Sequence, residues 1–148
     1  MRGGGAIEII LTAEECTALL SLRELHEELG ILKDGLKELK LLAISVSSPN
    51  MDGMPKAQGA AGDAYAQTMA RIEKQEQAIR RAERMIKGEQ AKTRRCLAGT
   101  GGSFRLFCAS YYIGGEPFEV AQAASGVQRS RCYDYARTVK QIATEKEE

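Results

Sequence analysis

Leucine recurs with helical spacing over the first third of the chain. Thr12 and Glu15 have the form of a capping box, so a helix is predicted to begin near residue 12. Leu11 and Cys16 occupy the positions of a hydrophobic staple at the same helix start. Steps of three and four residues then separate the members of one leucine stripe, Leu22, Leu25, Leu29, Leu32, Leu36 and Leu39. This a/d heptad pattern assigns the leucine stripe to helix packing and to oligomerisation.

A second, strongly charged helix is predicted from about residue 63 to residue 95. Its apolar positions keep one heptad frame, Met69, Ile72, Ile79 and Ile86. Two long helices joined by a loop most simply form an antiparallel hairpin. If the leucine stripe packed only on this second helix, Glu76 and Glu83 would face leucines, which is unfavourable unless their carboxylates extend to the edge of the interface. Pairing of the first helices of two chains would relieve that mismatch, so the sequence predicts a homodimer.

The connection between the two helices, residues 47–63, contains Pro49, Gly53, Pro55, Gly59 and Gly62. These residues exclude regular structure, and Asp63 is placed to cap the next helix. Connections of this length in small domains are usually functional or lack fixed structure, and composition alone does not choose between the two. The domain organisation we expect is a flexible N-terminus (1–11), the hairpin (12–98), a linker (99–103), a compact domain (104–142) and an acidic tail (143–148).

Three short helices are predicted in the C-terminal third. Ser103 is a candidate N-cap for a helix that ends at Ile113, and Gly114 and Gly115 follow it. Pro117 suits the first turn of a second helix, which ends at Ser125 and Gly126. A third helix is expected from Gln128 to about residue 141. Two helices joined by a glycine-bearing turn form a helix-turn-helix, in which the last helix enters the major groove of DNA.

The pattern of the last helix supports this interpretation. At 100° per residue its apolar side chains, Cys132, Tyr135, Ala136 and Val139, share one face. The opposite face and its flanks are polar and mainly basic, and they supply the candidate DNA-binding residues Arg129, Ser130, Arg131, Arg137 and Lys140. Arginine can bond two acceptors of guanine, whereas a lysine in this place would hold a phosphate. The alternative is the solvated face of an ordinary three-helix core.

Charge and aromatic residues are distributed unevenly along the chain. The 148 residues have a formal net charge of +1. Residues 1–58 nevertheless hold six basic and nine acidic residues, whereas residues 59–99 hold nine and five and residues 100–140 hold five and three. Seven of the eight aromatic residues lie within residues 104–135. The near-neutral total therefore conceals a basic excess after residue 58, which suits binding to a polyanion. The concentration of aromatic residues predicts that the C-terminal third has a core of its own.

The sequence offers little for catalysis or metal binding. The four cysteines form no C-x-x-C pair, and His26, the single histidine, is assigned to packing or to the surface. No nucleophile has a plausible base, so we expect no enzyme, no cofactor and no metal. The N-terminal sequence lacks the features of a secretory signal, and no apolar run approaches the roughly 18 residues of a membrane span. These features predict a cytoplasmic protein with no membrane partner.

Several motifs resemble a known family. Ser48-Pro-Asn-Met-Asp-Gly-Met-Pro-Lys56, Tyr111-Tyr112-Ile113, Glu119-Val120-Ala121 and the segment from Gly126 to Tyr133 are similar to phage late-gene transcription regulators of the RinA/ArpU type. The resemblance implies C-terminal helices like the promoter-binding region 4 of sigma factors. It also implies a phage or prophage origin, activation of late genes, and a bacterial host cytoplasm. It implies DNA contact by Arg129, Ser130, Arg131 and Arg137, and it implies no role for the Ser48–Lys56 loop.

Taken together, the sequence predicts an all-α protein, a long antiparallel helical hairpin followed by a three-helix helix-turn-helix domain. The leading hypothesis is a sequence-specific transcriptional regulator that binds double-stranded DNA, with bacterial RNA polymerase as a further candidate partner. One alternative is a DNA-packaging adaptor similar to a small terminase, which also joins a helix-turn-helix to an oligomerising segment. The other is a helical protein–protein interaction module that binds no DNA.

Overall fold

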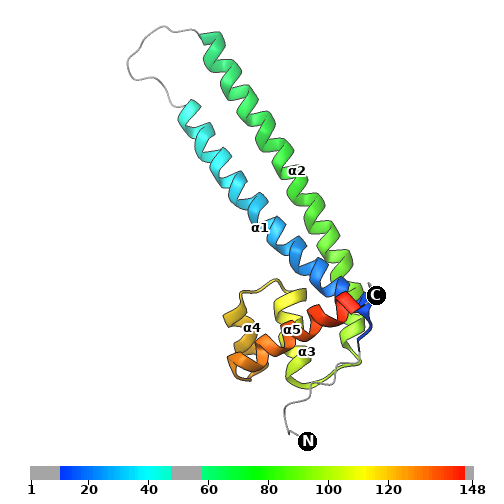
Figure 1. Ribbon diagram of the computed structural model, residues 1–148. Coiled ribbons are helices and arrows are strands. Elements are labelled where there is room, and N and C mark those ends of the chain that lie inside the picture. The colour runs from blue at the N-terminus through cyan, green and yellow to red at the C-terminus, as the bar shows by residue number, and fades with distance from the viewer. Residues whose placement is uncertain (1–10, 48–57, 146–148) are drawn as a thin grey trace, which may run out of the picture. The chain divides into compact units, whose positions relative to one another are not determined.

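The computed structural model describes residues 11–47 and 58–145 (Figure 1). This part of the chain contains helices and no strand, which confirms the predicted all-α class. The elements are α1 (Ala13–Ser47), α2 (Gln58–Leu97), α3 (Gly102–Cys108), the π-helix η1 (Ala109–Ile113), α4 (Phe118–Ser125) and α5 (Arg129–Glu145). The predicted flexible N-terminus up to residue 10, the Pro/Gly-rich loop over 48–57 and the last three residues of the acidic tail lie outside the described residues.

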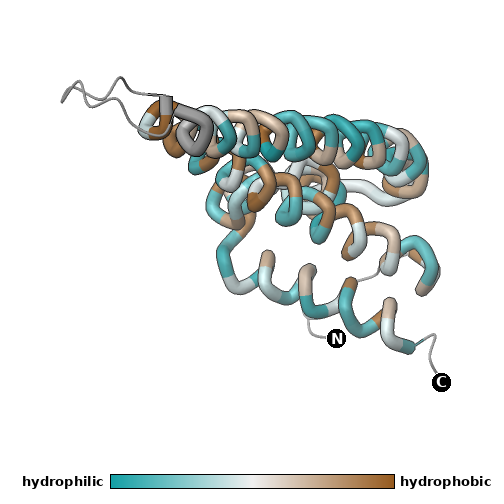
Figure 2. The backbone as a smooth tube through the Cα atoms, turned by 90° about the horizontal axis from the view of Figure 1, so that it is seen from above, coloured by the Kyte–Doolittle hydropathy of each residue, from teal (hydrophilic) through white to brown (hydrophobic). Residues whose placement is uncertain are grey.

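Two compact units divide the chain, and both long helices contribute to each. The first unit comprises Met1–Glu27 and Met85–Glu148, and the second comprises Glu28–Arg84. In the second unit α1 and α2 run antiparallel, as the sequence predicts (Figure 1). Hydrophobic and hydrophilic residues alternate along the helices (Figure 2). Each helix therefore has one apolar side available for packing.

The register of the hairpin gives its two central glutamates basic partners. Glu76 lies 3.9 Å from Nζ of Lys40, and Glu83 lies 3.7 Å from Nζ of Lys33. Both carboxylates therefore reach lysines on α1 at the edge of the interface, which is the arrangement in which glutamates beside a leucine stripe are tolerated. The mismatch that motivated a homodimer does not arise. Ile72 and Ile79 are buried, so the apolar pattern of the second helix does pack.

The second helix begins earlier than predicted. It starts at Gln58 and includes Gly59, Gly62 and Asp63, whereas the sequence predicts the two glycines in the loop and Asp63 as the helix cap. Glycine costs about 1 kcal/mol in a helix relative to alanine. Four alanines interleave with these residues, at 60, 61, 64 and 66. Their high helix propensity offsets the two glycines, so the helix extends past both.

The predicted start of the first helix is confirmed in detail. The backbone N–H of Thr12 donates to Oε1 of Glu15 at 2.9 Å, and the N–H of Glu15 donates to Oγ1 of Thr12 at 3.1 Å. These two bonds are the reciprocal pair of a capping box. Leu11 and Cys16 are both buried, as a hydrophobic staple requires.

The aromatic residues of the C-terminal third form one cluster around Phe107, which is fully buried. Its ring centre lies 5.2 Å from that of Tyr111, 5.7 Å from that of Phe118 and 5.9 Å from that of Tyr135. Edge-to-face and offset contacts of this kind stabilise a core beyond the area they bury. The aromatic residues do cluster as the sequence predicts, and the compact unit that holds them also includes residues 1–27 of the chain and the end of α2 from Met85.

Three details of the short helices differ from the sequence prediction. The helix after the linker begins at Gly102, and the hydroxyl of Ser103 shares a 2.7 Å hydrogen bond with that of Tyr135 instead of capping the helix. Pro117 precedes α4 as its N-cap, with ψ of 158°. The last helix reaches Glu145, four residues beyond the expected end. Gly126, with φ of +76°, ends α4 as predicted.

Candidate nucleic-acid interface

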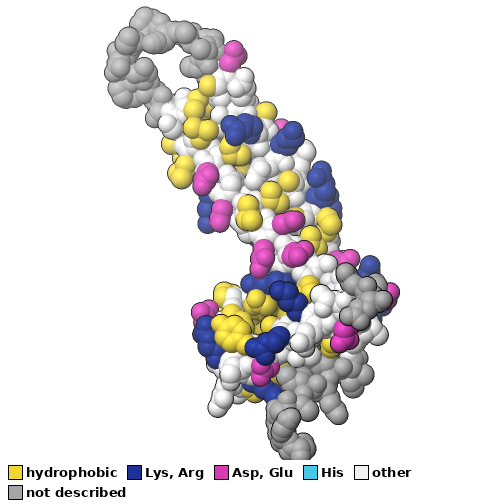
Figure 3. Space-filling view, viewed as in Figure 1, with side chains coloured by type: hydrophobic (Ala, Val, Ile, Leu, Met, Phe, Trp, Pro, Cys, Tyr) yellow, Lys and Arg dark blue, Asp and Glu magenta, His cyan; other side chains and the backbone are white. Residues whose placement is uncertain are grey.

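Helix α5 presents a buried face and a polar face. Cys132, Tyr135 and Val139 are buried, in agreement with the predicted helical wheel. Four of the five candidate DNA-binding residues are exposed, Arg129, Ser130, Arg137 and Lys140. Over α4 and α5, hydrophobic and basic side chains lie side by side on the surface (Figure 3). The exposed face of α5 therefore combines positive charge with apolar surface.

An aromatic platform, formed by Phe118 and Tyr133, lies at the start of this face. The two rings stack with centres 4.4 Å apart at an angle of 22°. Nη2 of Arg129 donates to the Tyr133 hydroxyl at 3.1 Å, and its guanidinium lies 5.5 Å from each ring centre. The side chain of Tyr133 remains 45% exposed. Aromatic surface beside a guanidinium is a combination that nucleic-acid-binding proteins use to contact bases and phosphates.

Arg131 does not point outward as the helical wheel suggested. It is half-buried, and its guanidinium lies 5.5 Å from the ring centre of Tyr135. The same side chain lines a pocket of about 420 Å³ with Gly126, Val127 and Gln128. A wheel places the Cα–Cβ bond only, and a long side chain can fold back over a neighbouring ring. Arg131 therefore contributes to packing at the start of α5.

Two other candidates have defined surroundings. Nη1 of Arg137 lies 2.7 Å from Oδ1 of Asp134, one turn earlier in α5. Lys140 lines a pocket of about 310 Å³ together with Arg23 and Tyr111. The sequence alone does not predict this ion pair, because a lone carboxylate on a helix gives no sign of which arginine it binds.

Ser125 holds the turn between α4 and α5. Its hydroxyl is buried and donates to the carbonyl of Gln122 at 2.7 Å. The same oxygen accepts from the N–H of Val127 at 3.3 Å and lies 3.4 Å from Sγ of Cys132. These contacts tie the end of one helix to the first turns of the next. They fix where α5 begins, whereas the sequence pattern predicts only the end of α4.

Three side chains from the long helices hold the segment that leads into α4. Nη1 of Arg23 donates to the carbonyls of Tyr111 and Glu116, at 2.9 and 2.7 Å. Nε2–H of His26 and Nε2 of Gln90 both donate to the carbonyl of Ile113, at 2.7 and 2.8 Å. We call Arg23, His26 and Gln90 the clasp. His26 is thus a packing residue, as expected, and the clasp positions α4 and α5 through the backbone that precedes them.

The cysteines of this unit are free, and burial makes two of them, Cys16 and Cys108, poor nucleophiles. Burial, with a smaller effect from the Glu15 carboxylate, raises the pKa of the Cys16 thiol to about 11. Burial also raises the pKa of Cys108 and of the Tyr112 hydroxyl far above their ordinary values. These groups are protonated at neutral pH. Within residues 11–47 and 58–145 no cluster of three or more His, Cys, Asp or Glu side chains is placed to hold a metal ion.

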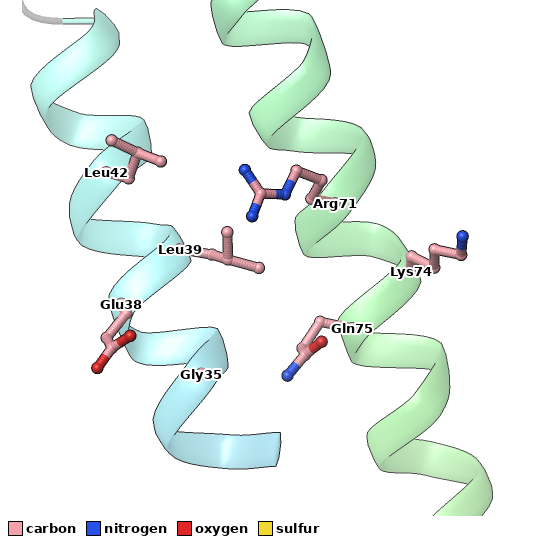
Figure 4. A pocket seen from close by; sticks show the side chains of 7 residues that line it. All are labelled: Gly35, Glu38, Leu39, Leu42, Arg71, Lys74 and Gln75. Carbon is pink, nitrogen blue, oxygen red and sulfur yellow. The ribbon is translucent and has the colours of Figure 1, made fainter. Parts of the chain in front are cut away.

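The second unit has a pocket of about 590 Å³ between its two helices (Figure 4). Arg71 and Gln75 point toward α1, whereas Lys74 points away. The amide of Gln75 donates to the backbone carbonyl of Leu32 at 2.9 Å, which closes one end of the pocket beside Gly35. The polar rim and the leucines along α1 make this an amphipathic groove.

The leucine stripe is divided between the two units. Leu22 is fully buried in the first unit, and Leu25 of the same unit is half-buried. Leu29, Leu32, Leu36 and Leu39 belong to the second unit and are half-buried. Larger exposures occur elsewhere on α1, at Ile31, Leu41, Leu42 and Ile44. The most exposed apolar surface of α1 in the second unit therefore lies largely outside the stripe that the heptad pattern selected.

None of the helices described here is long and apolar enough to cross a membrane. Comparison of the chain with protein-family models, with curated proteins and with solved structures finds no match.

Proposed function

We propose that this protein is a sequence-specific DNA-binding transcriptional regulator, and that α5 is its recognition helix. The single observation that supports this most is the outward face of α5, where Arg129, Ser130 and Arg137 are exposed opposite the buried Cys132 and Val139. Two helices joined by a short glycine turn present such a face to the major groove. The resemblance to phage late-gene regulators supports DNA as the partner, with polymerase contact as a further part of the proposal.

The contacts around α5 support a role for this helix in recognising DNA bases. Ser125 and the clasp fix the helix against the rest of its unit, so that its side chains are preorganised before any DNA arrives. Preorganisation lowers the entropy cost of binding. The aromatic platform adds apolar surface beside Arg129, which suits contact with a sugar or with a thymine methyl group. These features favour base reading over general attraction to DNA.

The test is a binding assay on duplexes from the upstream regions of neighbouring phage genes. Arg137→Ala should weaken binding by about 1–3 kcal/mol if the side chain reads a base. Arg80→Ala, an exposed arginine of the second unit, removes the same charge and serves as the matched control. Equal binding by both variants and by the unchanged protein would overturn the proposal. Arg131→Ala is less informative, because its guanidinium packs on Tyr135.

We also propose self-association through the second unit. Leu41, Leu42 and Ile44 are 67%, 43% and 64% exposed within four residues of α1, and Figure 3 shows hydrophobic side chains gathered over that part of the helix. Burying such residues between two chains would release water from apolar surface. Light scattering at tens of micromolar should give the mass of two chains, and Leu41→Glu should reduce it to one. A one-chain mass for the unchanged protein contradicts the proposal.

Particle size also separates the alternatives. A ring of many subunits, encoded beside a large terminase gene, would favour DNA packaging over regulation. A protein that self-associates but binds no duplex at any salt concentration would favour a helical interaction module.

A further inference from the structure

Asp134 is an acidic residue on the exposed basic face of α5. It is the first acid in a helix whose only other carboxylate is the terminal Glu145. Oδ1 of Asp134 lies 2.7 Å from Nη1 of Arg137, and the two side chains are 43% and 64% exposed. The pair therefore stands on the surface that the proposed function assigns to DNA.

Helix stability is a poor explanation for this pair. Exposed ion pairs at this spacing add little to a helix, because water screens both charges. A carboxylate on a DNA-binding face also has a cost, since it repels phosphates. A residue that adds little to stability and opposes general DNA binding needs another role.

The chemistry of the pair matches one base pair. A guanidinium has five N–H donors, and Asp134 uses one of them, which leaves four on Arg137. In the major groove guanine offers two acceptors, O6 and N7, and its cytosine offers an amino donor. Arg137 offers hydrogen-bond donors for the guanine, and Asp134 beside it offers an acceptor for the cytosine amino group. The same carboxylate repels the backbone phosphates that would otherwise compete for the guanidinium.

We propose that Asp134 is a specificity-determining residue that reserves Arg137 for the guanine of a G·C base pair and keeps it from phosphates. This inference rests on the proposed function, because it assumes that α5 lies in the major groove. Asp134 acts by orienting the guanidinium and by repelling phosphate, and Arg137 makes the base contact.

The experiment compares duplex selection by the full chain and by Asp134→Asn, which keeps the shape of the side chain and removes its charge. Both proteins are offered a pool of random-sequence duplexes. The affinity of each for its selected duplex and for the unselected pool is then measured over a salt series. Glu145→Gln makes the same charge change eleven residues later in α5 and is the matched control. Thermal melting checks that each variant is folded.

The unchanged protein should select G·C at one position or more. Asp134→Asn should lose about tenfold in preference at one of those positions, the value of a good bidentate contact. It should also bind the unselected pool more tightly, with a salt slope steeper by about one phosphate contact. Arg137→Ala should lose preference at the same position, and Glu145→Gln should keep it.

The inference fails if Asp134→Asn keeps the preference of the unchanged protein, or if the unchanged protein binds duplexes without base preference. The second result leaves general DNA binding intact. If the unchanged protein binds no duplex at all, the proposed function fails together with this inference, so the two failures are distinguishable.

Discussion

The guanidinium of Arg23 lies 4.0 Å from the centre of the Tyr111 ring, and its Nη1 donates to the backbone carbonyl of the same residue at 2.9 Å. These residues are 88 positions apart in the chain. One arginine of α1 thus binds both the face of an aromatic core residue and the backbone that leads into α4. This contact joins the first helix to the helices that present the candidate interface.

Arg23→Ala should lower the free energy of unfolding by about 2 kcal/mol, because charged hydrogen bonds to two carbonyls are lost along with the ring contact. Arg23→Lys should recover only part of this, since an ammonium lacks the planar fork. Chemical denaturation measures both. Arg84→Ala, an exposed arginine of α2, should change the value by less than about 0.5 kcal/mol. Equal effects of Arg23→Ala and Arg84→Ala would show that the contacts of Arg23 contribute nothing to stability.

Gly115→Ala should be more costly than Gly126→Ala. Both glycines have positive φ, +68° and +76°, so an added side chain is strained at either by about 1–2 kcal/mol. A Cβ at Gly115 would also lie within 2.8 Å of Cδ2 of His26 and closer still to two other ring atoms, whereas Gly126 has open space. Denaturation midpoints of the two variants measure the difference.

A double variant separates backbone strain from the clash. Adding His26→Ala to Gly115→Ala should reduce the cost of the glycine substitution toward that of Gly126→Ala. If the cost of Gly115→Ala is the same with and without His26, the packing of the histidine ring on this turn has no energetic consequence.

Glycines within α1 should respond oppositely to alanine. Gly30→Ala should stabilise the protein by up to about 1 kcal/mol, because the position is exposed and an added Cβ meets nothing. Gly35→Ala should gain less or lose stability, since its Cβ would lie 2.9 Å from Nε2 of Gln75, which donates to Leu32. Thermal melting of the two variants gives the comparison. A larger gain at Gly35 would contradict the described packing.

The burial of Cys16 predicts a loss of stability at alkaline pH. Its thiol pKa is raised from 9.0 to about 11 in the folded chain. Above pH 9 the unfolded chain releases this proton first, so the contribution of Cys16 to stability is complete below pH 9 and is lost as the pH rises toward 11. The difference in unfolding free energy between the unchanged protein and Cys16→Ala should therefore shrink between pH 9 and 11.

Leu19→Ala is the control for this pH dependence, because Leu19 is also buried in α1 but has no ionisable group. Its effect on stability should be the same at pH 9 and at pH 11. A difference for Cys16→Ala that stays constant over this range would show that the thiol ionises equally easily in both states.

Local features of the fold were predictable from the sequence, and features that depend on tertiary contacts were not. The capping box at Thr12 involves residues three apart, and the turn at Gly126 depends on one residue's conformational freedom, so both follow from local chemistry. The partner of Glu76 depended on the hairpin register, because Lys40 lies on the other helix. The Arg23–Tyr111 contact has no local signal at all.

The candidate interface shows the same division. The helical wheel of α5 identified Cys132 and Val139 as buried, because the period of a helix fixes which Cβ atoms point inward. It misplaced Arg131, whose long side chain folds over Tyr135. It also gave no role to Asp134, since an ion pair depends on the rotamers of two flexible side chains.

The most direct test of the central claim is the affinity of the full chain for duplex DNA over a salt series, measured for the unchanged protein and for Arg129→Ala, Arg137→Ala and Arg80→Ala. We predict binding that weakens steeply with salt, because phosphate contacts release counterions, and that weakens further with each substitution in α5 but not with the control in the second unit. Binding that ignores salt, or that is equal for all four proteins, would contradict the assignment of α5 as a DNA-reading helix.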